Sequence, residues 1–107
     1  MGYVAHDTVL IETVGEEREA RIVAFRESLP ERWRTLLIGP IPGLVNSTSF
    51  WAFMPDGSKE YWDTSDEGDV HREAFLSLLD EMRVDYVHVR WGGDYGIEVG
   101  PTIAARS

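Results

Sequence analysis

The residues of this chain that could carry out chemistry are three histidines, a large set of carboxylates and several serines, with no cysteine among them. The histidines, His6, His71 and His88, lack the i, i+2 or i, i+4 spacing typical of metal ligands. The missing cysteine excludes thiolate nucleophiles and cysteine-ligated metals. No G-x-S-x-G nucleophile elbow occurs. The sequence therefore predicts no cofactor, no metal site and no catalytic residue, and favours a non-enzymatic protein.

One enzymatic alternative stays open in the alternating segment 85–91 and the glycine-rich turn that follows it. His88 and Arg90 share one face of this predicted strand, and Asp94 lies in the turn. His88 and Arg90 could act on a single anionic group, so a small metal-dependent hydrolase using residues 86–96, with Asp94, remains possible. This hypothesis requires His88 to lie in a concave pocket with a carboxylate within reach.

Acidic residues dominate the charge. The net charge is −9, and residues 56–85 hold ten acids against three basic residues, a net of −7. Such a surface repels phosphates and anionic membranes. We therefore expect a protein partner with a basic surface, and no direct binding to nucleic acid or membrane. An acidic mimic of nucleic acid that blocks a DNA-binding protein is a further alternative, although Arg72 and Arg83 interrupt the acidic row.

Aromatic residues are numerous for 107 residues, with four tryptophans and four tyrosines. Tryptophan and tyrosine are enriched in protein interfaces because they bury a large area at low entropy cost. The aromatic-acidic segment that begins at Tyr61 leads into the predicted second helix. The predicted partner-binding surface consists of Trp51, Tyr61, Trp62, Asp63, Asp66, Glu67 and Asp69.

Hydrophobic periodicity predicts the elements that position these residues. Alternating or β-branched runs predict strands at residues 7–14, 35–41, 48–54, 59–63, 85–91 and 97–99. Helical spacing predicts helices over 16–29 and 70–83 and a short helical turn through Trp33. A turn at 55–58 joins 48–54 to 59–63 as a hairpin, and Asp69 caps the second helix after an acidic loop at 64–68.

This order of elements predicts an α+β fold with two helices packed on one face of a mainly antiparallel sheet. The specific expectation is a ferredoxin-like βαββαβ core with an extra hairpin, as a single domain over 1–100 with a flexible C-terminal tail over 101–107. The first fourteen residues lack the basic region of a signal peptide, and no apolar run reaches the ~20 residues that span a bilayer. We therefore expect a cytoplasmic protein.

A sheet with helices on one face leaves its other face uncovered. Phe50, Ala52 and Met54 lie on one face of the predicted strand 48–54, and Trp51 and Phe53 lie on the other. Monomers rarely expose a large apolar patch. We therefore expect a homodimer that stacks or pairs the hairpin formed by 48–54 and 59–63 around a two-fold axis, with Trp51 or Trp62 at its centre.

Three short motifs resemble those of small uncharacterised bacteriophage proteins. The chain begins Met1-Gly2-Tyr3, followed by the apolar run 9–11; it carries Tyr-Trp-Asp at 61–63 ahead of a helix. It closes with an aromatic and arginine-containing strand and an acidic turn over 87–94. The resemblance implies a phage-encoded protein acting in the host cytoplasm. The resulting hypothesis is a small acidic accessory protein that binds a host protein.

Overall fold

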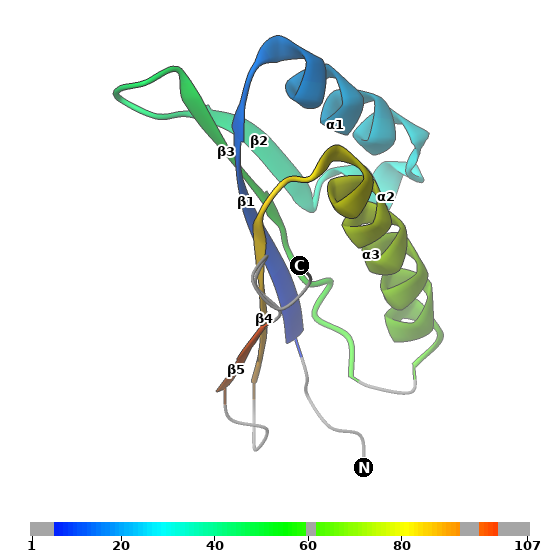
Figure 1. Ribbon diagram of the computed structural model, residues 1–107. Helices are drawn as coiled ribbons and strands as arrows, with labels where there is room; N and C mark the ends of the chain where they lie inside the picture. The colour runs from blue at the N-terminus through cyan, green and yellow to red at the C-terminus, as the bar shows by residue number, and fades with distance from the viewer. Residues whose placement is uncertain (1–5, 60–61, 93–96, 101–107) are drawn as a thin grey trace.

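The computed structural model describes residues 6–59, 62–92 and 97–100 (Figure 1). The described strands are β1 (His6–Val14), β2 (Leu37–Pro42), β3 (Thr48–Phe53), β4 (Tyr86–Trp91) and β5 (Ile97–Gly100). The described helices are α1 (Glu16–Ser28), α2 (Glu31–Arg34) and α3 (Asp63–Met82).

The strands form one antiparallel sheet in the order β2-β3-β1-β4-β5. The long strand β1 is central because it pairs with β3 on one side and β4 on the other. The order β2-β3-β1-β4, with α1 after β1 and α3 after β3, is the ferredoxin-like βαββαβ arrangement. β5 is an extra strand that pairs back on β4. The predicted α+β fold is therefore confirmed.

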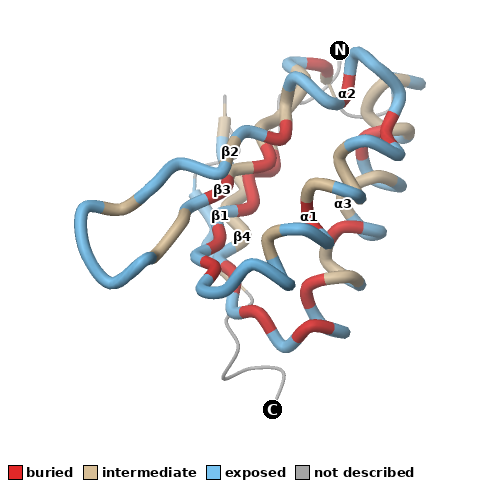
Figure 2. Tube along the Cα trace, turned by 90° about the horizontal axis from the view of Figure 1, so that it is seen from above, coloured by how far each residue is buried: buried red, intermediate tan, exposed pale blue. Residues whose placement is uncertain are grey.

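All three helices lie on the same side of the sheet (Figures 1 and 2). The buried residues gather between the two layers, as Figure 2 shows. Odd-numbered residues of β1 point to the helices, and alternation of the side chains along a strand sends the even-numbered ones to the other face. The core consists of Val9, Ile11, Ile22, Leu29, Trp33, Leu37, Trp51, Phe53, Phe75, Leu79, Met82, Val84 and Tyr86.

Two tryptophans of this core lie directly against glycines. A Cβ added to Gly39 would lie 2.7 Å from Cδ2 of Trp51, and one added to Gly68 would lie 2.9 Å from Cη2 of Trp33. Gly39 also has a φ of 143°, in the region that favours glycine. Gly39 thus lets β2 approach the Trp51 ring of β3 within the sheet, and Gly68 lets α3 approach the Trp33 ring of α2 within the helix layer.

The structure corrects the sequence prediction in the middle of the chain. Asp63 begins α3, and Lys59 and Trp62 belong to no strand, so the predicted second hairpin arm at 59–63 is wrong in the part described. Residues 64–68 are helical rather than a loop, and Asp69 lies inside α3 instead of capping it. The first backbone hydrogen bond of the helix runs from the N–H of Asp66 to the Trp62 carbonyl, at 3.1 Å, and hydrogen bonds from Arg32 and Trp33 to Glu67 stabilise its first turns.

None of the helices within the described ranges combines the length and the apolar character needed to cross a bilayer. Tyr61, Asp94 and the predicted tail at 101–107 lie outside the described residues.

Candidate interaction surface

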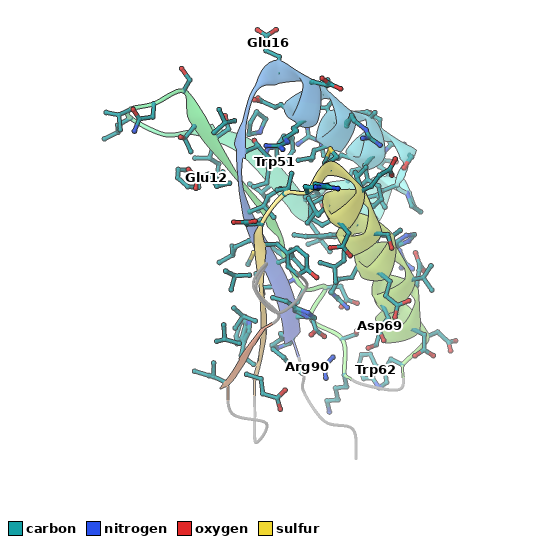
Figure 3. The ribbon with its side chains drawn as sticks, in the orientation of Figure 1. Glu12, Glu16, Trp51, Trp62, Asp69 and Arg90 are labelled. Atoms are coloured by element: carbon teal, nitrogen blue, oxygen red, sulfur yellow. The ribbon has the colours of Figure 1, made fainter. Side chains whose placement is uncertain are left out.

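The structure separates the residues of the predicted partner-binding surface. Trp51 is only 1% exposed and lies between β3 and the helices, with the guanidinium of Arg26 5.2 Å from its ring centre. Trp51 therefore cannot contact a partner, and the prediction that it belongs to a binding surface or forms the centre of a dimer is wrong. Trp62 is 53% exposed at the start of α3. Figure 3 shows Trp62 and Asp69 near this end of the helix, far from Trp51.

Glu67 is held by contacts within the chain. Its carboxylate accepts hydrogen bonds from Arg32 Nη2 at 2.6 Å and from the indole N–H of Trp33, and His71 Nε2 lies 3.4 Å away. The hydrogen bond from Arg32 is the largest cause that lowers the pKa of Glu67, with further hydrogen bonds from Trp33 and His71. Glu67 thus links α3 to α2, and its carboxylate is already occupied by partners within the chain.

Asp69 is also neutralised locally. Its Oδ1 accepts from Arg72 Nη1 at 2.8 Å, one helical turn along α3. The remaining described members of the predicted surface are Trp62, Asp63 and Asp66, and both acids lie in the first turn of α3. Carboxylates at this position stabilise a helix by interacting with its dipole. The acidic end of α3 therefore has a structural role.

A second polar cluster surrounds the buried carboxylate of Asp7 on β1; the sequence pointed to His88 and Arg90 in it but not to Asp7. Oδ1 of Asp7 accepts from His88 Nε2 at 2.7 Å and from Arg90 Nε at 3.0 Å, and Arg72 Nη1 lies 3.7 Å from Oδ2. Burial acts to raise the pKa of Asp7, but the hydrogen bonds from His88 and Arg90 and the charge of Arg72 outweigh it, so the pKa is lowered. The cluster links β1, β4 and α3.

His88 also lines a hollow of about 300 Å³ together with Arg90, Glu98, Val99 and Gly100. The hydrolase alternative needs His88 in a concavity with a carboxylate nearby, and this geometry meets that condition. Within the described ranges, no group of three histidine, cysteine, aspartate or glutamate side chains is placed to hold a metal ion. The arrangement can orient an imidazole, but the Asp7 carboxylate that orients it is shared with two guanidinium groups.

The face of the sheet opposite the helices carries a different set of side chains. The pairing register places Ile38, Ala52, Leu10 and Val87 in one row across β2, β3, β1 and β4. We call this the Leu10 row. Parallel rows run on either side of it: Thr8, Val89 and Val99; His6, Trp91 and Ile97; Ile41, Phe50 and Glu12. We call the whole set, with Val14, the open face.

Apart from the buried Thr8, the side chains of the open face are partly or largely exposed, and the face is almost free of charge. Leu10 and Phe50 are each 45% exposed, and Ile38, Ile41, Val14, Val87, Trp91, Ile97 and Val99 are exposed to similar or greater extents. Glu12 is the only charged side chain that the described strands place on it, and Figure 3 shows Glu12 and Trp51 on opposite sides of the sheet. Asp85 borders the face and lines, with Glu12, Leu10, Phe50 and Val87, a hollow of about 380 Å³.

Part of this surface was visible in the sequence. Alternation in 48–54 placed Phe50 and Ala52 opposite Trp51, and the structure confirms that division. The contribution of Leu10 and Val14 was missed, although the segment 7–14 is apolar on both of its faces. The Asp7 cluster could not be found from spacing, because 81 residues separate Asp7 from His88.

No family model, curated protein or solved structure matches this chain.

Proposed function

We propose that this protein is a non-enzymatic protein-binding module and that the open face is its binding surface. The observation that carries the proposal is the Leu10 row with its neighbours, an exposed surface on which one charge stands among apolar side chains. In a chain with 27% charged residues, this segregation is large. Contiguous apolar surface of this extent is typical of a site that another macromolecule covers.

The acidic end of α3 takes a secondary part in this proposal. Glu67 and Asp69 are committed to Arg32 and Arg72, whereas Trp62, Asp63 and Asp66 remain available to a basic protein surface. A net charge of −9 accelerates the approach of such a surface, and an exposed tryptophan can then be buried. Binding to a basic host protein stays a prediction, and so do the bacteriophage origin and the cytoplasmic location.

A small hydrolase is the second candidate, favoured by one observation: His88 is hydrogen-bonded to Asp7 at 2.7 Å and lines a hollow. It ranks below the binding module because no serine, threonine or cysteine is among the described lining residues. A hydrolase that uses His88 would lose its activity in a His88→Gln variant that still folds.

The binding proposal is tested by placing a charge on the open face. Leu10→Lys alters the centre of that face, and Val70→Lys is the matched control, because Val70 is a 64% exposed apolar residue on α3. Association of each variant with itself and with proteins captured from a bacterial lysate is compared with that of the wild type. We expect Leu10→Lys alone to lose association. The proposal is wrong if both variants behave alike.

A further inference from the structure

We infer that the partner covering the open face is a second copy of this chain, stacked sheet against sheet about a two-fold axis. This inference rests on the proposed function, because it names the occupant of the same surface. It keeps the two-fold axis expected from the sequence but moves the contact from the 48–54 and 59–63 hairpin to the open face, since Trp51 is buried and residues 59, 62 and 63 form no strand.

The size of the open face suits a dimer. Five strands about 4.8 Å apart give a width of about 24 Å, and six-residue strands rising about 3.3 Å per residue give a length of about 20 Å. The flat area is therefore about 480 Å² per copy, or about 960 Å² for two, before the relief of the side chains is added. Specific interfaces need about 1,000 Å² or more in total.

The chemistry of the open face selects a copy of itself over a basic partner. A basic surface placed here would meet a single strand carboxylate, Glu12, and would leave its remaining charges desolvated without partners. An equally apolar face incurs no such penalty, and a two-fold interface brings the same patch together from both copies. The Leu10 row, which is apolar across four strands, then lies at the centre.

The distribution of charge permits this contact in spite of the net charge of −9. The helices lie on the far side of the sheet from the open face (Figure 2), so their carboxylates stay about 10 Å or more from the interface. At physiological salt the screening length is about 8 Å, which weakens repulsion between the two helix layers. Repulsion between the acidic residues of two copies is therefore weaker when the copies meet through their open faces than when they meet through their helices.

Glu12 constrains how the two sheets align. It lies two residues from Leu10 along β1, close to Asp85 at the border of the open face. With the two-fold axis along the Leu10 row, the two copies of Glu12 lie on opposite sides of that axis, about 13 Å apart along the strand direction. Each carboxylate then reaches the rim, and like charges do not meet. An axis parallel to the strands would instead bring both copies to the same end of the interface.

Sedimentation equilibrium at moderate salt, from low to high micromolar concentration, tests the inference. We expect a dimer for the wild type and for Val70→Lys, and a monomer for Leu10→Lys and Val87→Lys, with the dissociation constant raised about 100-fold or more. Leu10 and Val87 are 45% and 36% exposed, so a lysine can extend into solvent in a folded monomer. Far-ultraviolet circular dichroism identifies any variant that fails to fold.

Two results would overturn the inference. If the wild type has a monomer mass at every concentration, the occupant is not a second copy; the proposed function then survives only if Leu10→Lys loses a captured partner that Val70→Lys keeps. If the dimer persists in both open-face variants, the copies associate through another surface. The two failures are therefore distinguished by the same set of proteins.

Discussion

The two faces of the sheet are both apolar, yet only one of them is covered. Trp51 and Phe50 are neighbours on β3; the first is 1% exposed beneath the helices, and the second is 45% exposed on the open face. The same contrast holds on β1 between Val9, which is completely buried, and Leu10, which is 45% exposed. The described helices all lie on one side (Figure 2). Apolar residues on the covered face thus stabilise the fold, and those on the open face remain available for binding.

The largest expected effect comes from replacing Trp51 with alanine, compared with the same replacement of its β3 neighbour Phe50. Trp51→Ala removes a buried ring and its contact with Arg26, so we expect a loss of about 3–5 kcal/mol in the free energy of unfolding. Phe50→Ala removes a half-exposed ring and should cost the monomer at most about 1 kcal/mol. Urea unfolding at low micromolar concentration measures both. Equal losses would show that the two faces are not distinct in the isolated chain.

Asp7→Asn is expected to destabilise the protein by about 1–3 kcal/mol, because it removes the charge that His88, Arg90 and Arg72 surround. The lowered pKa of Asp7 means that its stabilising contribution is present above its ordinary value of 3.8 and is lost as the pH falls through the lower folded-state value. The wild type and the variant should therefore converge in stability at strongly acidic pH.

The control for this effect is Glu73→Gln, which removes a carboxylate from the exposed side of α3. Urea titrations at a series of pH values compare the three proteins. A constant gap between the wild type and Asp7→Asn down to the lowest pH would contradict the assignment.

Gly68→Ala is expected to destabilise the protein by about 1–2 kcal/mol, although alanine ordinarily favours a helix over glycine. The new methyl group would lie 2.9 Å from the Trp33 ring, so the ring or α3 must move. Pairing it with Trp33→Phe in a double-mutant cycle checks the cause. The cost of the alanine should fall when the smaller ring is present, and a cost independent of residue 33 would exclude the steric explanation.

The smallest expected effect comes from neutralising Glu12, the strand carboxylate of the open face. Glu12→Gln removes the carboxylate that dimerisation would partly desolvate, so the dimer dissociation constant should fall a few-fold. Glu73→Gln reduces the negative net charge by the same one unit but lies on α3, and should leave the dissociation constant nearly unchanged. Sedimentation of both variants at the same salt decides between a local effect and a general effect of net charge.

Local patterns in the chain were sufficient for most of the fold. The β-branched alternation of 7–14, the helical spacing of 16–29 and the alternation of 85–91 each predicted an element whose ends differ from the observed ones by only one residue. Because these elements follow one another in a ferredoxin-like order, the antiparallel topology was also predictable. The physical reason is that each of these segments has a hydrophobic period that matches a single type of backbone.

The start of α3 depended instead on distant parts of the chain. Residues 63–69 are polar, contain Gly68 and have no apolar period, so their local signal is that of a loop. In the structure, Glu67 binds Arg32 and Trp33, more than thirty residues away, and Gly68 packs against the Trp33 ring. Contacts between segments far apart in the sequence stabilise these turns, and a local pattern carries no information about such contacts.

The candidate surface, too, was predictable in part from the sequence and in part only from the tertiary structure. Alternation showed that β3 has two apolar sides, but only the placement of the helices decided that Trp51 is covered and Phe50 is open. Likewise, the Asp7 cluster and the Leu10 row exist because the strand order brings β4 beside β1. A strand's sequence specifies which residues share a face, whereas the packing of whole layers determines which of its two faces meets water.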